Sequence, residues 1–330
     1  MKRSYYIYSN GQLKRKDNNI QFETVEGEKR TIPIETASDF YIFSEMSLNT
    51  KLLDFFSQNG VIIHFFNYYS YYSGSYIPKE RYLSGDLLVK QVKHYLDLEK
   101  RQYLAQCFVM GAAQHIYRNL RYYNSRHIEC TAELNEINDL IKSISLAKDI
   151  PTLMGIEGQI RRKYYVLWNL IMLQNMKFEK RIKNPPDNQI NTLISFVNSL
   201  MYAKTLSEIY KTQLNPTLSY LHKPGNRRYS LSLDISEIFK PILGDRLIFS
   251  LINKRQISEK DFDERTELIT LKKNASQKIV AEFDKRMEQT IKHNTLKRQV
   301  SYQYLIRLEC YKLIKHLLDE KEYVPFKMWW

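Results

Sequence analysis

The sequence predicts an α+β protein in which a small β-rich N-terminal domain is followed by a larger all-α domain. Short aromatic and β-branched runs fill the first 78 residues, and apolar residues at helical spacing dominate the rest. The charge follows the same division, because residues 1–78 hold eight basic and eight acidic residues while the whole chain carries +14. We expect a β-rich domain at 1–78, a linker at 79–90 and a helical domain at 91–330.

The N-terminal region opens with a strand-like run at residues 5–8 (Tyr-Tyr-Ile-Tyr). It leads into Asn10-Gly11, which predicts a hairpin turn because both residues tolerate positive φ. Further strand-like runs lie at residues 20–25, 30–34, 40–43 and 61–66. Apolar spacing over 48–56 predicts a helix that ends at Asn59-Gly60. In the apolar run 61–66, His64 is predicted to be a hydrogen-bonded core residue and not a ligand.

The following residues, 67–85, are rich in Tyr, Ser and Gly and predict a loop or linker. From residue 87 to 168 the apolar spacing is helical, with a break at Pro151. Pro185-Pro186 and the Lys-Pro-Gly-Asn turn at 223–226 mark the next breaks, and a last helix is predicted over 299–318.

Cysteine usage and the N-terminus exclude several classes of protein. Cys107, Cys130 and Cys310 are widely spaced without a CxxC pair, which argues against a zinc ribbon and favours reduced, buried thiols. The basic N-terminus lacks a following apolar stretch, and no run approaches the ~20 apolar residues of a membrane helix. We therefore expect a cytoplasmic protein that does not span a membrane.

The positive charge indicates a polyanionic partner. Residues 157–255 contain sixteen basic and seven acidic residues, a net of +9. A solvated basic helix face would account for some of this excess. Its concentration in one segment favours a polyanion-binding surface over a solvated face, with nucleic acid as the expected partner and an anionic membrane surface as the weaker alternative.

Acidic residues and one histidine recur within this basic segment. If residues 231–239 are helical with Ser230 as N-cap, Asp234 and Glu237 share a face. His222 precedes the turn at 223–229, which is placed to fold it back onto these acids. Upstream, Glu157 lies on a second predicted helix, and four of its residues are expected along one face: Glu157, Arg161, Tyr164 and Trp168.

Two or three carboxylates with one imidazole form a mostly oxygen donor set that suits Mg²⁺ or Mn²⁺. Beside phosphates, such a metal neutralises developing charge and activates an attacking oxygen. An acid pair three residues apart is also what a solvated helix face carries. From spacing alone, both interpretations stay open.

Three motifs in order resemble the family of CRISPR-associated protein one, the adaptation integrase. The first is Gly155-Ile156-Glu157-Gly158 with Tyr164 following the acid; the second runs from Leu214 to His222. The third runs from Ser230 to Pro241 and is followed by Asp245-Arg246.

The resemblance implies that Glu157, His222 and Glu237 match the ligands of a Mg²⁺ or Mn²⁺ ion. Asp234 matches a supporting acid that either joins the catalytic site or neutralises nearby basic groups. We expect DNA contacts at Arg161, Tyr164, Arg227, Arg228, Lys240 and Arg246.

The family implies insertion of new spacers into CRISPR arrays in antiviral immunity, by attack of a 3′-hydroxyl on a phosphodiester. It implies double-stranded DNA as substrate, a homodimer formed through the β-domains and a small ferredoxin-like adaptation partner. Two alternatives stay open at this point. One is a non-catalytic nucleic-acid-binding scaffold, and the other is a nuclease acting on RNA or branched DNA.

Overall fold

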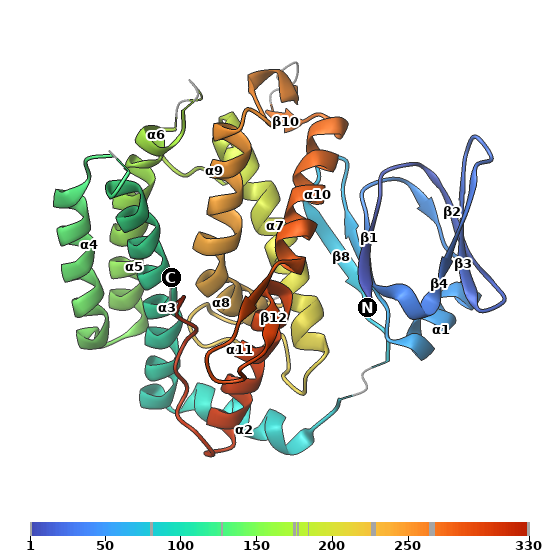
Figure 1. Cartoon of the computed structure of the whole chain (residues 1–330). Coiled ribbons are helices and arrows are strands. Elements are labelled where there is room, and N and C mark those ends of the chain that lie inside the picture. Colours follow the sequence, from blue (N-terminus) through green and yellow to red (C-terminus); the bar gives the residue numbers. More distant parts are fainter. Residues whose placement is uncertain are drawn as a thin grey trace. The chain divides into compact units, whose positions relative to one another are not determined.

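The computed structural model describes residues 2–79, 82–126, 128–173, 176, 178–183, 185–225, 229–263 and 268–328. Contacts divide the chain into two compact units, Met1–Leu83 with Leu271–Asp284, and Ser84–Thr270 with Lys285–Trp330. The first unit is rich in strands and the second is helical (Figure 1). The predicted α+β class is therefore confirmed, while the division at 78 and 91 stays a prediction.

The first unit contains two four-stranded sheets. One has the order β1-β5-β7-β8, with the first three strands parallel and β8 antiparallel to β7. Its strands are β1 (Arg3–Ile7), β5 (Ala37–Ile42), β7 (Ile62–Phe66) and β8 (Tyr72–Tyr76). The other has the order β4-β3-β2-β6 and comprises β2 (Gly11–Lys16), β3 (Asn19–Thr24), β4 (Lys29–Pro33) and β6 (Met46–Ser47). A short turn of helix, η1 (Ile34–Thr36), links β4 to β5.

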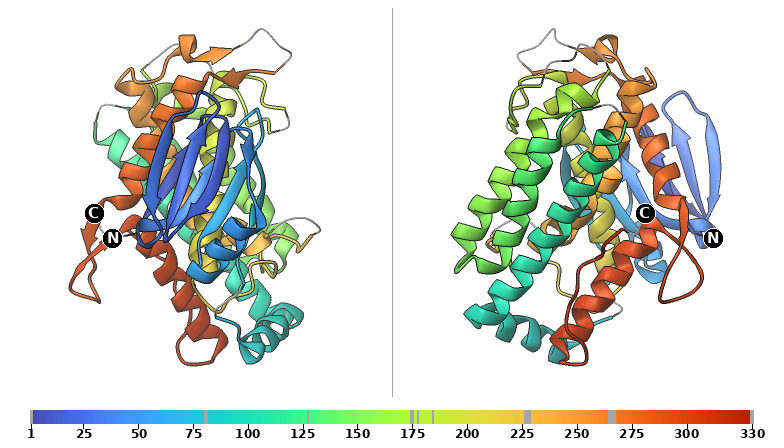
Figure 2. Two further views of the ribbon diagram at one scale, coloured as in Figure 1. Left: turned by 90° about the vertical axis from the view of Figure 1, so that its right-hand side faces the viewer. Right: turned by 60° about the vertical axis from the view of Figure 1, so that its left-hand side comes forward.

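Helix α1 (Thr50–Asn59) joins the two sheets in one apolar core. The Asn49 side chain accepts a hydrogen bond from Leu52 N at 2.9 Å and caps the helix start. Gly60 ends it at φ +66°, a conformation that glycine adopts without a Cβ clash, which confirms the predicted end. The core takes Leu13 from one sheet and Phe40 from the other, and Figure 2 (left) shows both sheets.

Two local predictions in this unit are wrong. Asn10-Gly11 does not form a hairpin, because β1 and β2 belong to different sheets. The hairpin lies between β2 and β3, where Asp17 takes the left-handed conformation at φ 53°. The segment predicted as a loop also contains strand β8. His64 is fully buried with Nδ1 2.7 Å from Ser75 Oγ, which confirms its role in the core.

Helix α10 (Lys273–Glu288) begins in the first unit and ends in the second. Its buried Ile279 and Phe283 belong to the first unit by contacts. Tyr6 on β1 donates a hydrogen bond to Asp284 Oδ1 at 2.8 Å. A segment expected within the helical domain is thus part of the strand-rich unit.

The second unit is built from helices, with bounds that largely follow the predicted spacing. They are α2 (Gly85–Leu96), α3 (Leu98–Asn124), α4 (Thr131–Ser143), α5 (Ile150–Val166), α6 (Trp168–Ile171), α7 (Gln189–Tyr210), α8 (Ser230–Phe239), α9 (Arg246–Asn253) and α11 (Tyr302–Leu317). Shorter pieces are η2 (Ile144–Leu146), η4 (Glu259–Asp261) and the π-helical η3 (Lys240–Asp245). Two small strand pairs complete the chain: β9 (Phe262–Asp263) with β10 (Thr270–Leu271), and β11 (Thr290–Lys292) with β12 (Gln299–Ser301).

Helices α3, α4 and α5 pack against one another (Figure 2, right), and α8 packs against α3 and α7. Helix α7 is buried along most of its length. The three cysteines are buried and free, as predicted. Among the described residues, no helix has the length and apolarity needed to cross a membrane.

The segment after α11 is fixed to the helical core by hydrogen bonds. Glu309 Oε1 accepts one from Tyr323 Oη at 2.6 Å and one from Phe326 N at 2.9 Å. His115 Nε2 accepts from Met328 N at 3.0 Å, and its Nδ1 lies 2.8 Å from the carbonyl of Ile238. Since Nε2 must be the acceptor, Nδ1 carries the proton and donates it to α8. Burial lowers the pKa of His115 to about 4, which keeps the ring neutral.

Candidate active site

A pocket of about 490 Å³ lies in the helical unit, and five of the ten predicted site residues line it. Its walls come from α5, the segment 179–183, α7, the loop before α8, and the junction of α8 with η3. The charged lining consists of six Lys or Arg and four Asp or Glu residues: Arg161, Arg162, Lys180, Arg181, Lys183, Lys240, Glu157, Glu179, Glu237 and Asp245. His222 lines the same pocket.

Helix α5 supplies Glu157 and Arg161. Asp149 caps it by accepting from Thr152 N at 2.7 Å, and Pro151 occupies the first turn, where a missing N–H costs nothing. The spacing of four residues places Glu157 and Arg161 on one face, with Arg161 Nε 2.7 Å from Glu157 Oε1. The predicted alignment of these two side chains is therefore confirmed.

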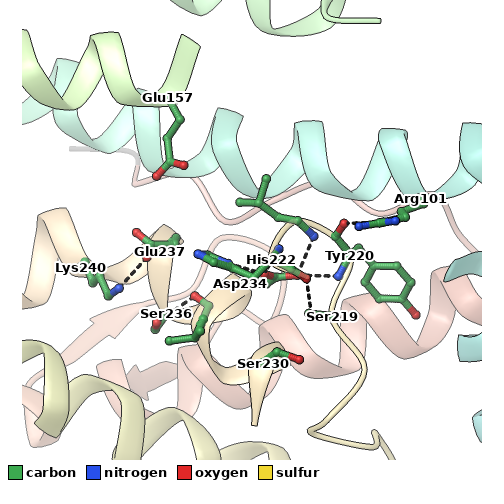
Figure 3. A network of polar contacts seen from close by, with 12 residues as sticks. Arg101, Glu157, Ser219, Tyr220, His222, Ser230, Asp234, Ser236, Glu237 and Lys240 are labelled. Carbon is green, nitrogen blue, oxygen red and sulfur yellow. Dashed lines mark hydrogen bonds and ion pairs between the residues drawn. The ribbon is translucent and has the colours of Figure 1, made fainter. Parts of the chain in front are cut away.

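The loop before α8 is shaped around the buried carboxylate of Asp234 (Figure 3). Asp234 Oδ2 accepts from Tyr220 N at 2.7 Å and Leu221 N at 3.0 Å. Asp234 Oδ1 accepts from His222 N at 3.1 Å and lies 2.7 Å from His222 Nδ1. Arg101 on α3 holds the other side of this loop through the carbonyl of Tyr220 at 3.0 Å.

This contact sets the tautomer of His222. The Asp234 carboxylate already accepts from three backbone N–H groups, so it is also the acceptor for the ring: the proton lies on Nδ1, and in the neutral imidazole the lone pair is on Nε2. Burial alone lowers the pKa of His222, but the hydrogen bond and charge of Asp234, together with the charge of Glu237, outweigh it and raise the pKa above its usual value. Asp234 therefore positions the histidine and is not itself part of the pocket lining.

Glu237 follows Asp234 by three residues on α8, and its side chain is 10% exposed. Lys240 Nζ lies 2.5 Å from Glu237 Oε1, and Arg161 Nη2 contacts Glu237 Oε2. Burial raises the pKa of Glu237, yet the charges of Arg161 and Lys240 prevail and lower it to about 2. Figure 3 shows Glu157 pointing from α5 toward Glu237 on α8 and His222 on the preceding loop.

The donor set fits a hard divalent cation chemically. The carboxylates of Glu157 and Glu237 and the imidazole of His222 line one pocket, and Asp234 holds Nδ1 of that imidazole, as carboxylates do behind metal-binding histidines. In the arrangement seen here, no three His, Cys, Asp or Glu side chains of the described residues are grouped closely enough to hold a metal. The two glutamates instead share Arg161.

Asp245, at the end of η3, was part of a motif but not a predicted site residue. Burial raises its pKa to about 7, although Arg161 and a hydrogen bond from Tyr164 act in the opposite direction. Because the folded state keeps a proton that the unfolded chain releases, stability falls as pH rises from the ordinary Asp pKa toward 7.

We expect Asp245→Asn to remove this loss. In urea unfolding without divalent metal, the variant should gain on the order of 4 kcal/mol relative to wild type between about pH 4 and about pH 8. Asp139→Asn is the control, because that carboxylate is 72% exposed. An Asp245→Asn difference that does not change with pH would contradict the expectation.

The remaining predicted residues are divided between pocket and core. Lys240 lines the pocket. Tyr164 is fully buried, and its hydroxyl accepts a hydrogen bond from Asn119 Nδ2 at 3.2 Å. Its side chain therefore has no exposed surface for the expected DNA contact. Arg246 lies away from the pocket lining, with its guanidinium 5.5 Å from the ring centre of Tyr122. Arg227 and Arg228 lie outside the described residues.

Two further sequence expectations on these helices are wrong. Ser230 is the first residue of α8 and not its N-cap, which is Tyr229. The Ser230 hydroxyl instead donates to the carbonyl of Thr217 at 2.6 Å, so it binds the preceding loop. Trp168 is buried and begins α6 after a break in the helix at Leu167, so it does not continue the face of Glu157.

Sequence reasoning missed the basic segment 179–183. It contributes Lys180, Arg181 and Lys183 to the pocket, and Arg181 is held by Ser195 Oγ at 2.9 Å and Asn191 Oδ1 at 3.0 Å. The run Glu-Lys-Arg-Ile-Lys was visible within the basic region. Its position beside Glu157 depends on the tertiary fold.

Comparisons with known proteins agree with this architecture. A family model described as CRISPR associated protein Cas1 matches residues 5–285. A CRISPR-associated endonuclease Cas1 of Fusobacterium nucleatum subsp. nucleatum is 58% identical over 330 residues, covering 100% of this chain and 98% of the relative. The structure of a CAS1 protein from Thermotoga maritima matches with a TM-score of 0.88 at 38% identity, covering 98% of this chain and 100% of that one.

A casposase bound to integration product has a TM-score of 0.87 at 19% identity, covering 98% of this chain and 92% of the casposase, and shows the fold alone. The strand-rich unit, the helical unit and the pocket lined by both acidic and basic residues together define a protein of Cas1 architecture. The chain belongs to the CRISPR associated protein Cas1 family, as its three motifs predicted.

Proposed function

We propose that this protein is a metal-dependent DNA endonuclease and integrase that inserts new spacers into CRISPR arrays. The observation that carries the proposal is the convergence of Glu157, His222 and Glu237 in one pocket with six Lys or Arg residues. A purely structural surface that binds phosphates has no need of buried acids, since they repel the backbone unless a cation lies between. The names of curated relatives as CRISPR-associated endonucleases also support it.

In this proposal Glu157, His222 and Glu237 would hold Mg²⁺ or Mn²⁺, which supplies charge neutralisation and activation of the attacking oxygen. Asp234 would keep the proton on Nδ1 of His222, which leaves Nε2 of the neutral ring free to bind the metal ion. Lys183 and Arg162 on the pocket wall bind phosphate oxygens. The 3′-hydroxyl of the incoming strand gives up its proton and bonds to phosphorus as the bond from that phosphorus to the 3′-oxygen of the flanking target strand breaks; the released oxygen takes up a proton, so one phosphodiester replaces another.

The proposed partners are double-stranded DNA, a second copy joined through the strand-rich unit, and a small ferredoxin-like adaptation protein. Part of a chain in a structure described as a Cas6-RT-Cas1–Cas2 complex has the same fold, with a TM-score of 0.85 at 16% identity, covering 99% of this chain and 36% of that one. The near-neutral first 78 residues suit protein contacts, because they need not hold phosphate.

The deciding experiment is strand transfer of a short duplex with free 3′-hydroxyls into a plasmid that contains the repeat. We expect joined products with Mn²⁺ or Mg²⁺ and none with EDTA. Salt-sensitive DNA binding without turnover in any divalent metal would instead favour the scaffold. Faster cleavage of RNA or branched DNA than strand transfer would favour the nuclease alternative.

The charge division makes a separate prediction about DNA binding. Lys180→Gln with Lys183→Gln removes two pocket cations, so the slope of log K against log salt should become shallower by about 0.9 per lost phosphate contact. The matched control is Lys29→Gln with Lys51→Gln, two changes in the strand-rich unit. Equal effects of the two pairs in a fluorescence titration would contradict the proposed division of labour.

A further inference from the structure

We propose that Arg161 pairs with Glu157 and Glu237 when no metal is bound, and that it competes with the divalent cation for these two carboxylates. This inference rests on the proposed metal site and adds a role to a residue first expected to contact DNA. It makes Arg161 a positioning residue, which holds the carboxylates of two helices together before a metal arrives.

The geometry of Arg161 carries the inference. Its Nε lies 2.7 Å from Glu157 Oε1, and its Nη2 contacts Glu237 Oε2, so one guanidinium links α5 to α8. The three side chains are only 16%, 18% and 10% exposed for Glu157, Arg161 and Glu237. Each contact is a charge-assisted hydrogen bond, and the planar guanidinium with its several N–H donors reaches both carboxylates at once.

The charges explain why pairing and metal binding exclude each other. Arg161 and Lys240 balance Glu157 and Glu237, so the four side chains together are neutral. A divalent cation added to this neutral group would meet two cations at the oxygens it requires. When Arg161 leaves the carboxylates, its repulsion of the divalent cation is removed. The freed guanidinium then lies beside the other Lys and Arg residues of the pocket lining, where a DNA phosphate is expected to bind.

Arg162 gives a matched comparison within the same helix. It lines the pocket and is exposed, and the glutamates take their contacts from Arg161 and Lys240. Removing either arginine changes the net charge of the pocket equally. A difference in metal affinity between the two variants therefore comes from the contacts of Arg161 with the two glutamates and not from the loss of one positive charge. Arg161→Lys keeps the charge but replaces the fork by a single ammonium.

The test is the Mn²⁺ dissociation constant, measured from the electron paramagnetic resonance of free Mn²⁺ without DNA. We expect Arg161→Gln to bind Mn²⁺ about tenfold more tightly than wild type, with Arg162→Gln within about twofold and Arg161→Lys in between. Without metal, Arg161→Gln should unfold about 5 °C below wild type, and Mn²⁺ should raise its melting temperature more than that of wild type. If Arg161→Gln does not fold without metal, the Arg161→Lys value decides.

The outcomes separate this inference from the proposed function. Mn²⁺ binding by wild type with unchanged or weaker binding by the Arg161 variants would overturn the role of Arg161 and leave the metal site intact. Equal tightening by Arg162→Gln would also overturn it, because the effect would then be general electrostatics. Binding by neither wild type nor variant would overturn both proposals.

Discussion

Asp234→Asn is expected to lower the free energy of unfolding by about 3 kcal/mol and to remove strand-transfer activity, although Asp234 does not line the pocket. The carboxylate is fully buried and receives hydrogen bonds from three backbone N–H groups and from His222 Nδ1. An asparagine amide has only one oxygen, so at least one buried donor would face an NH₂ group. The loop that places His222 would then lose its anchor.

Urea unfolding and strand transfer measure these two effects together. Ser232→Ala is the matched control on the same helix, because Ser232 Oγ is buried without a hydrogen-bond partner among the described residues. Its replacement should leave stability and activity near wild type. Full activity of a stably folded Asp234→Asn would show that the histidine does not depend on this carboxylate.

His222→Ala is expected to reduce metal-dependent strand transfer by at least about a hundredfold, since losing a partner behind a metal ligand already reduces function by 10–100-fold. DNA affinity should stay within about twofold, because the basic wall is untouched and phosphate contacts dominate affinity. Glu157→Ala should behave alike in activity, and the loss of its negative charge should not weaken DNA binding.

Gel-based strand transfer and a fluorescence titration of the same duplex measure the two quantities. His293→Ala serves as the control, because His293 lies in the turn between β11 and β12 and outside the pocket lining. Its activity should match wild type. Full metal-dependent activity of His222→Ala would refute the site, and an equal fall in DNA affinity and activity would indicate a binding role.

Local patterns predicted most of the fold because they depend on neighbouring residues. The helix ending at Asn59-Gly60 and the buried strand around His64 follow from apolar spacing and a glycine cap, and both are confirmed. The hairpin at Asn10-Gly11 was wrong because a turn signal does not say which strands pair, and β1 pairs with the distant β5. The grouping of residues 271–284 with the strand-rich unit likewise depends on contacts with residues 1–83, which are distant in the sequence.

The candidate site shows the same division between local and long-range information. Glu157, His222 and Glu237 were selected by the order of three motifs, and the structure brings them to one pocket. Asp234 and Glu237 were expected to share a helix face, but their different contacts arise from burial and from the loop folded over Asp234. No spacing rule joins Arg161 to Glu237, because the two lie on helices that meet only in the fold.

The shared helix α10 has a consequence for the order in which the chain acquires its structure. Since Leu271–Asp284 belongs to the strand-rich unit, that unit is assembled from two stretches separated by Ser84–Thr270, the larger part of the helical unit. During synthesis from the N-terminus, the strands of the two sheets emerge together, but Tyr6 cannot bond Asp284 until the chain reaches residue 284. The strand-rich unit is therefore the first to begin and among the last to finish, so a ribosome-bound fragment ending before residue 271 should carry it in an incomplete, protease-sensitive form.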